Sequence, residues 1–206
     1  LSFYPNLSLS MIPDSVFLLD LAHFTPTKQL DLPFLGEPFF CFSLSMLPMD
    51  FRDTQSKSSI VSVINQLKEI VPNAVLIAKD VEDQVIKDIA KLTGSYFIGA
   101  KFSYWEIAYI LSKSMFLFSG RYHHLIFSAK VGCPVIPMAS SSHKIHGLTE
   151  LFEGIMPSPI DPTDLWEEKA NIVQAAKKIV SSQELRASYL AKVETLSNAV
   201  EMHSRV

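Results

Sequence analysis

Residues 115–137 read MFLFSGRYHHLIFSAKVGCPVIP and contain the clearest structural pattern of the chain. A short apolar run is followed by a Ser-Gly turn, a stretch with helical spacing, a glycine and a second apolar run. This order is typical of a strand, a helix and a second, parallel strand. In open α/β sheets, ligands bind beyond the carboxyl ends of the strands, where helix N-termini attract anions. Arg121, His123 and His124 at this helix start therefore indicate an acidic substrate.

The same alternation extends over most of the chain and predicts an α/β fold. We expect a Rossmann-like parallel sheet flanked by helices, followed by a helical C-terminal tail. The predicted strands span residues 39–44, 74–78, 96–98, 115–118 and 134–138. The predicted helices span residues 59–70, 83–92 and 104–111, the stretch that begins at Arg121, and, in the tail, 164–180 and 184–202.

Changes in composition divide the chain into three segments. Residues 1–37 are rich in Pro, Ser and Phe and are predicted to be a lead-in and interdomain segment, with one edge strand over the apolar run 16–21. Residues 38–160 form the predicted Rossmann-like donor-binding domain, and residues 161–206 are predicted to be helices that pack on it. Because the chain begins with Leu1, we expect an excised piece whose upstream half is missing.

The composition argues against a nucleic-acid-binding or membrane protein. With 206 residues, 48% hydrophobic, and a net charge of −3, the chain has no general electrostatic attraction to nucleic acid or anionic lipid. No apolar run is long enough to cross a bilayer. Cys41 and Cys133 lie in apolar runs and are expected to be small buried side chains, which favours a cytoplasmic location. Trp105, Tyr109 and Met115 are expected in the core.

The loops after the predicted strands supply the candidate site, because the carboxyl ends of parallel strands meet at one edge. A guanidinium can bind carboxylate or phosphate through two N–H groups, and an imidazole can exchange a proton near neutral pH. On the helix after Ser119, the spacing puts Tyr122 on the buried stripe and leaves Arg121, His123 and His124 off it. The candidate edge residues are Ser43, Ser45, Arg52, Lys79, Asp80, Lys101, residues 119–124 and residues 140–144.

Common catalytic and metal-binding signatures are absent from the sequence. His143 and His146 are three residues apart and have no acidic or cysteine partner nearby, so no metal site is predicted. The sequence has no phosphate-binding loop, dinucleotide-binding glycine motif, nucleophile elbow or H-E-x-x-H motif. The basic edge does not suit the paired carboxylates of a glycoside hydrolase. No cofactor is predicted.

Several motifs resemble those of the polysaccharide pyruvyl transferases, whose members carry an Arg-x-His at a helix start, a Gly-x-Pro before the next strand and a lysine after that strand. Here the similar motifs are Ser119-Gly-Arg121-Tyr-His123, Gly132-Cys-Pro134, and Lys144 before Gly147. Pro13-Asp14 and Gly36-Glu37-Pro38 are similar to the interdomain entry of the family, so the resemblance covers about residues 12–155. Many members have an arginine where this chain has Ser45, and Arg52 is the nearest substitute.

The resemblance implies the C-terminal half of a glycosyltransferase-B-like architecture. Its reaction would move the enolpyruvyl group of phosphoenolpyruvate onto two hydroxyls of a sugar, giving a pyruvate ketal in cell-surface glycan synthesis. The implied partners are phosphoenolpyruvate, a glycan or lipid-linked sugar acceptor, and a missing N-terminal domain or a second copy. Arg121 would bind the donor, His123 would protonate its methylene carbon, and the other substrate-binding residues would be Ser119, His124, Lys144, Ser142 and Arg52.

Two other functions remain open from the sequence. The first is a nucleotide-sugar glycosyltransferase of the same architecture, in which Glu150 or Glu153 would hold the donor ribose or diphosphate. The second is a non-catalytic binding or assembly module that retains the fold.

Overall fold

A computed structural model of the chain describes residues 13–21, 32–44, 54–78, 83–140 and 142–204. Five strands form a sheet in the order β3-β2-β1-β4-β5, and every neighbouring pair is parallel. The strands are β1 Phe39–Ser43, β2 Asn73–Ile77, β3 Tyr96–Ile98, β4 Leu117–Ser119 and β5 Val135–Pro137. The predicted Rossmann-like parallel sheet is therefore confirmed, with strand ends that lie within about two residues of the predicted ones.

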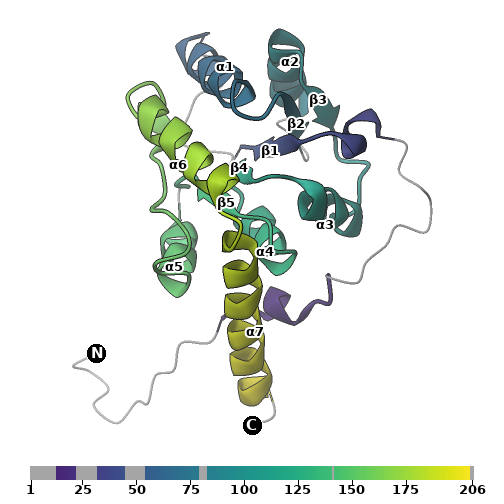
Figure 1. Cartoon of the computed structure of the whole chain (residues 1–206), viewed down its shortest axis with the longest axis vertical. Coiled ribbons are helices and arrows are strands. Elements are labelled where there is room, and N and C mark those ends of the chain that lie inside the picture. Colours follow the sequence, from purple (N-terminus) through teal and green to yellow (C-terminus); the bar gives the residue numbers. More distant parts are fainter. Residues whose placement is uncertain (1–12, 22–31, 45–53, 79–82, 141, 205–206) are drawn as a thin grey trace.

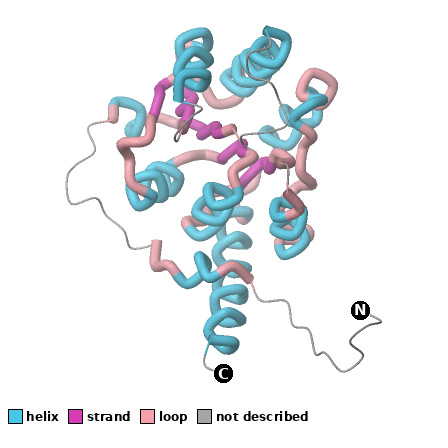
Figure 2. The backbone as a smooth tube through the Cα atoms, turned by 180° about the vertical axis from the view of Figure 1, so that it is seen from behind, coloured by secondary structure: helices cyan, strands magenta, loops and turns pink. Residues whose placement is uncertain are grey.

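Helices cover both faces of this sheet, as Figures 1 and 2 show. One face is covered by α1, α2 and α6, and the other by α3, α4, α5 and α7. Short 3-10 helices precede β1 and α6. The helices are α1 Thr54–Lys68, α2 Asp83–Thr93, α3 Tyr104–Lys113, α4 Tyr122–Lys130, α5 Lys144–Leu151, α6 Lys169–Ser181 and α7 Leu185–Ser204, and the 3-10 helices are η1 Ser15–Leu18, η2 Pro33–Gly36 and η4 Pro162–Asp164.

The strands are apolar along their length because both of their faces are buried. In β1, Phe39 and Cys41 pack with the layer that contains α4, whereas Phe40 and Phe42 pack with the layer that contains α1. All of these side chains have an exposed fraction of 0%. Strands buried on both faces read as continuous apolar runs, which is why sequence patterning located them well.

The C-terminal helices pack on the sheet layers, as the tail was expected to do. Helix α6 contacts α1 and β5, and α7 contacts α4 and η1. At the start of α7, the Arg186 guanidinium donates hydrogen bonds to the carbonyls of Ser112, Ser114 and Gly132. One turn later, Tyr189 Oη accepts a hydrogen bond from the Val135 amide at 3.3 Å. The division into segments at residues 37 and 160 stays a prediction.

The predicted edge strand over residues 16–21 is wrong. Ser15–Leu18 form the 3-10 helix η1, which begins where the Asp14 carboxylate accepts a hydrogen bond from the Val16 amide at 2.9 Å. The Phe17 side chain is buried, and its carbonyl accepts hydrogen bonds from Lys130 Nζ and Ser197 Oγ. A short apolar run without alternation fits either structure, and these long-range contacts select the helical turn.

Two further expectations need correction. Trp105 is 38% exposed rather than part of the core, because it lies on the outer side of α3, and Tyr109 and Met115 are half-buried. The expected helix over residues 164–180 is also shorter, since η4 and a turn precede α6. At the start of η4, the Asp161 carboxylate accepts a hydrogen bond from the Thr163 amide at 2.9 Å.

We expect the protein to lose stability in alkaline solution because the Cys133 thiol is buried. Burial raises the pKa of its thiol from 9.0 to about 11, while the unfolded chain keeps the lower value. The unfolded state therefore releases this proton first, and stability is lost between about pH 9 and 11, by roughly 3 kcal/mol for this group. Urea unfolding at pH 8 and pH 10 should show that Cys133→Ala weakens this dependence. An equal pH dependence in both proteins would contradict the assignment.

Candidate functional site

The switch point of the sheet lies between β1 and β4. These strands are neighbours and parallel, but the helix after β1 covers one face and the helix after β4 covers the other. In sheets of this kind, ligands bind at the carboxyl ends of the two strands that flank such a point. The residues at this point are Ser43 of β1, Ser119 of β4 and the start of α4.

A buried hydrogen-bond network joins these elements. Ser43 and Ser119 are paired in the strand register, and their hydroxyl oxygens lie 2.6 Å apart. Ser43 Oγ also lies 3.0 Å from His124 Nδ1, and Ser119 Oγ accepts a hydrogen bond from the Arg121 amide at 2.9 Å. Ser43, Ser119 and His124 are at most 2% exposed. The start of α4 is thus bound to the ends of both central strands.

One direction of donation gives both serine hydroxyl protons an acceptor within the network. Ser119 Oγ accepts from the Arg121 amide and donates to Ser43 Oγ, which in turn donates to His124 Nδ1. In this arrangement His124 Nδ1 is the acceptor. With the opposite direction, the Ser119 hydroxyl would accept two hydrogen bonds within the network and would have no acceptor there for its own proton.

Arg121 is held in place at the N-cap of α4. Its Nε donates to the Leu44 carbonyl at 2.8 Å, so the guanidinium reaches from α4 to the end of β1. The Arg121 side chain does not cap the helix, and the first intrahelical hydrogen bond runs from the Leu125 amide to the Arg121 carbonyl. The amides of Tyr122 and His123 precede that bond, which is the arrangement that attracts anions.

The two adjacent histidines have different surroundings. His123 is exposed, and its ring centroid lies 5.5 Å from that of Tyr122 and 6.4 Å from that of Phe127. His124 is 2% exposed, which corrects the expectation that it lies off the buried stripe. Helical spacing identified the centre of the buried face, but α4 packs against the sheet, α3, α7 and η1 and is buried from His124 to Lys130.

Lys144 lies near the start of α4 although it follows a different strand. Its ammonium is 5.7 Å from the centroid of the Tyr122 ring. Lys144 was expected in a loop, but it is the first residue of α5 and is exposed. Burial, with a smaller contribution from the Asp14 carboxylate, raises the pKa of Tyr122, so this ring stays a neutral platform below Lys144.

The remaining expected site residues are less closely connected. Ser142 is exposed, and its hydroxyl lies 3.4 Å from that of Ser140. Lys101 is exposed in the connection after the edge strand β3. Arg52, Ser45, Lys79 and Asp80 lie outside the residues that the structure describes.

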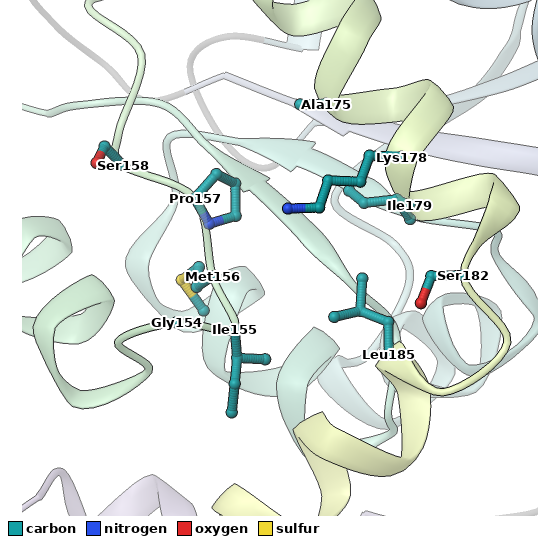
Figure 3. A pocket seen from close by; sticks show the side chains of 10 residues that line it. All are labelled: Gly154, Ile155, Met156, Pro157, Ser158, Ala175, Lys178, Ile179, Ser182 and Leu185. Carbon is teal, nitrogen blue, oxygen red and sulfur yellow. The ribbon is translucent and has the colours of Figure 1, made fainter.

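Two other features of the structure lie outside this arrangement. Among the described residues, no group of three or more His, Cys, Asp or Glu side chains could hold a metal ion. A mainly apolar pocket of about 340 Å³ lies between residues 154–158 and the junction of α6 and α7, and Lys178 extends into it (Figure 3). This pocket is near the C-terminal end of α6, away from the switch point.

A family model for polysaccharide pyruvyl transferases matches residues 2–142. The chain belongs to this family. A search of curated proteins finds no match. The family match covers β1 to β5 and all of α4, so the motif around Arg121 and His123 lies inside it.

Solved structures with a similar fold include glycosyltransferases and UDP-GlcNAc 2-epimerases. A UDP-GlcNAc 2-epimerase from Neisseria meningitidis bound to UDP-GlcNAc has a TM-score of 0.54 and 12% identity, over 82% of this chain and 44% of that chain. MnaA from S. aureus, in a co-structure with UDP, has a TM-score of 0.54 and 15% identity over the same shares. CalG4, the calicheamicin glycosyltransferase, has a TM-score of 0.52 and 14% identity, over 88% and 43%.

These similarities establish a glycosyltransferase-B-like fold for this pyruvyl transferase family member. The chain spans less than half the length of each of these structures. No helix among its described residues is long and apolar enough to cross a membrane.

Proposed function

We propose that the chain is the donor-binding half of a polysaccharide pyruvyl transferase that uses phosphoenolpyruvate and a glycan or lipid-linked sugar acceptor in the cytoplasm. The observation that carries the proposal is the gathering of Arg121, His123 and Lys144 around the start of α4, at the switch point of a fold shared with sugar-modifying enzymes. A further domain or a second copy would contribute to the acceptor site.

The chemistry of this edge fits a compact anion. The Arg121 guanidinium can hold a carboxylate or phosphate through two parallel hydrogen bonds, and its contact with the Leu44 carbonyl fixes its direction. The amides at the start of α4 and the Lys144 ammonium add positive potential. Phosphoenolpyruvate carries both a carboxylate and a phosphate, so it can use two such groups at once.

In the proposed reaction, one proton is added to the methylene carbon of phosphoenolpyruvate while a sugar hydroxyl forms a bond to the adjacent carbon. The bond from that carbon to the phosphate oxygen then breaks, and a second hydroxyl of the same sugar takes its place. The two hydroxyls release two protons, of which one balances the proton gained by the methyl group and the other leaves with phosphate or solvent. The products are a pyruvate ketal and phosphate.

His123 is the proposed source of the proton on the methylene carbon. Its imidazole is exposed at the first turn of α4, two residues from Arg121, and side chains there lean toward the helix N-terminus. A group that exchanges protons near neutral pH suits this step. The buried His124 is not exposed to a ligand in the same way, so its proposed role is to hold Ser43 and the start of α4 in position.

The nucleotide-sugar alternative has weaker support from the described residues. Its candidates Glu150 and Glu153 lie at and beyond the C-terminal end of α5. Because α5 begins at the carboxyl edge of the sheet, these carboxylates lie toward the opposite edge, far along the helix from Lys144.

Phosphoenolpyruvate should stabilise the protein against heat. At about 100 times its dissociation constant, a ligand that binds only the folded state adds about 2.7 kcal/mol to the free energy of unfolding. Thermal unfolding with phosphoenolpyruvate, inorganic phosphate and a nucleoside diphosphate should show selective stabilisation by phosphoenolpyruvate. Arg121→Ala should abolish this effect, and Arg121→Lys, which keeps the charge but loses the planar fork, should reduce it.

Lys91→Ala is the matched control, since it removes an exposed basic residue from the last turn of α2, outside the candidate residues. It should leave the stabilisation unchanged. Selective stabilisation by the nucleoside diphosphate would instead support the glycosyltransferase alternative, and an undiminished phosphoenolpyruvate effect in Arg121→Ala would contradict the proposed donor site.

A further inference from the structure

A polar pocket of about 310 Å³ lies between the first turns of α1 and the segment around η4. Its volume is at the lower end of the range typical for small-molecule sites, about 300–1,000 Å³. The polar and aromatic side chains that line it are Gln55, Ser56, Ser59, Thr163, Asp164, Trp166 and Glu167. The family match ends at residue 142, so six of the nine residues that line the pocket lie beyond the matched region.

This pocket lies at the same edge of the sheet as Arg121. Helix α1 follows β1 and therefore begins at the carboxyl edge. Ile160 forms a parallel bridge with Met138, directly after β5, and its carbonyl accepts a hydrogen bond from the Ala139 amide at 2.7 Å. The chain that continues into η4 thus extends beyond the carboxyl ends of the strands. The pocket and α4 are separated by the sheet layer, because α1 and α4 cover opposite faces.

Ser59 presents a buried hydroxyl to this pocket. It is 9% exposed, and among the described residues its side chain makes no hydrogen bond. A buried hydroxyl without a partner is unfavourable, by about 1–3 kcal/mol from mutational data. A ligand with hydroxyl groups would supply the missing hydrogen bond from the pocket side.

Two carboxylates at the pocket are also available for hydrogen bonding. Within the described parts of the chain, the side chains of Asp164 and Glu167 make neither a hydrogen bond nor an ion pair. An ionised carboxylate only accepts hydrogen bonds, so its natural partners are hydroxyl or ammonium donors. The same charges repel phosphate and carboxylate, so this pocket does not suit phosphoenolpyruvate.

Trp166 adds a flat apolar surface to these groups. Its side chain is 57% exposed, which is unusual for so large an aromatic residue. The Lys169 ammonium lies 4.2 Å from the centroid of the Trp166 ring and donates a hydrogen bond to Ser62 Oγ at 3.3 Å, which restrains the ring against α1. A sugar ring has a polar edge of hydroxyls and an apolar face of C–H groups, and this pocket offers both kinds of contact.

We infer that this pocket binds a neutral sugar ring of the acceptor glycan. The inference deepens the proposed function and rests on it, since it assigns one sugar ring of the acceptor to this pocket and the anionic donor to the region of Arg121. Charge explains why donor and acceptor would bind at different places. The basic groups of α4 and α5 attract an anionic donor, whereas the acidic groups near η4 suit a neutral ligand with hydroxyl donors.

Intrinsic fluorescence can test the pocket because the chain has only two tryptophans, Trp105 and Trp166. In Trp105→Phe, Trp166 is the sole indole, and titration with neutral methyl glycosides of galactose, glucose, mannose and N-acetylglucosamine should give a saturable change in emission for at least one of them. The matched variant Trp166→Phe keeps only Trp105, and its emission should not respond. No saturable change with any glycoside, or an equal response from Trp105, would overturn the inference.

Ser59→Ala and Asp164→Asn, each in the Trp105→Phe background, then test the polar contacts. Each should weaken glycoside binding by at least fivefold, and Ser59→Ala should not lower thermal stability, because the hydroxyl makes no hydrogen bond in the described structure. Unchanged affinity in both variants would overturn the inference.

Thermal stabilisation by phosphoenolpyruvate shows whether a negative result contradicts the sugar pocket or the proposed function. The donor should stabilise Asp164→Asn as it stabilises the parent protein. A normal phosphoenolpyruvate effect without any glycoside response would overturn the sugar pocket alone. A glycoside response without any phosphoenolpyruvate effect would support the sugar pocket and contradict the proposed donor.

Discussion

Replacing His123 with alanine is expected to lower the rate of pyruvyl transfer by roughly 10²–10⁴-fold, the usual contribution of a general acid. The side chain is exposed at the first turn of α4, where it can reach a donor held by Arg121. The loss should appear in the catalytic rate more than in donor affinity, because the proposed proton transfer occurs in the transition state. Transfer of labelled pyruvate from phosphoenolpyruvate to a glycan measures it.

Stability and donor binding provide the controls for this experiment. His123 makes ring contacts with Tyr122 and Phe127 but is exposed, so His123→Ala should change the free energy of unfolding by no more than about 0.5 kcal/mol. Stabilisation by phosphoenolpyruvate should also persist. A variant with full transfer activity would rule out the proposed role of His123, whereas loss of activity together with loss of folding would leave the role to be tested with His123→Gln.

Replacing the neighbouring His124 with alanine should have the opposite effect, a loss of about 2–4 kcal/mol of stability. The substitution leaves a cavity in a fully packed region and removes the ring nitrogen that lies 3.0 Å from Ser43 Oγ. The Ser43 hydroxyl keeps its contact with Ser119 but loses the acceptor of its own proton in the interior, which adds to the cost of the cavity. Equilibrium unfolding in urea measures the change.

A double-mutant cycle separates the hydrogen bond from the packing. Ser43→Ala and His124→Ala should each destabilise the protein, and their combined effect should be smaller than the sum by about 1 kcal/mol or more, because both remove the same hydrogen bond. Additive effects would mean that the Ser43 and His124 side chains are not coupled. Unfolding of His124→Ala within about 0.5 kcal/mol of the parent protein would contradict the buried network itself.

Sequence patterning was sufficient to locate the elements that are buried on both faces. The strands are buried on both faces, so their apolar runs could be located without knowledge of their neighbours. The run at residues 16–21 was misassigned because its conformation depends on hydrogen bonds from Lys130 and Ser197, which are more than 100 residues away in the chain.

In the candidate site, too, some features follow from the local sequence and others from contacts between distant segments. The sequence by itself determined the order of strands and helices, the basic motif at Arg121 and His123, and the family, because these depend on local periodicity and on residues close together in the chain. Only the tertiary structure decided that His124 is buried against Ser43, 81 residues earlier, and that η4 and α1 share a pocket. Such contacts depend on how distant segments pack, and local spacing carries no information about that.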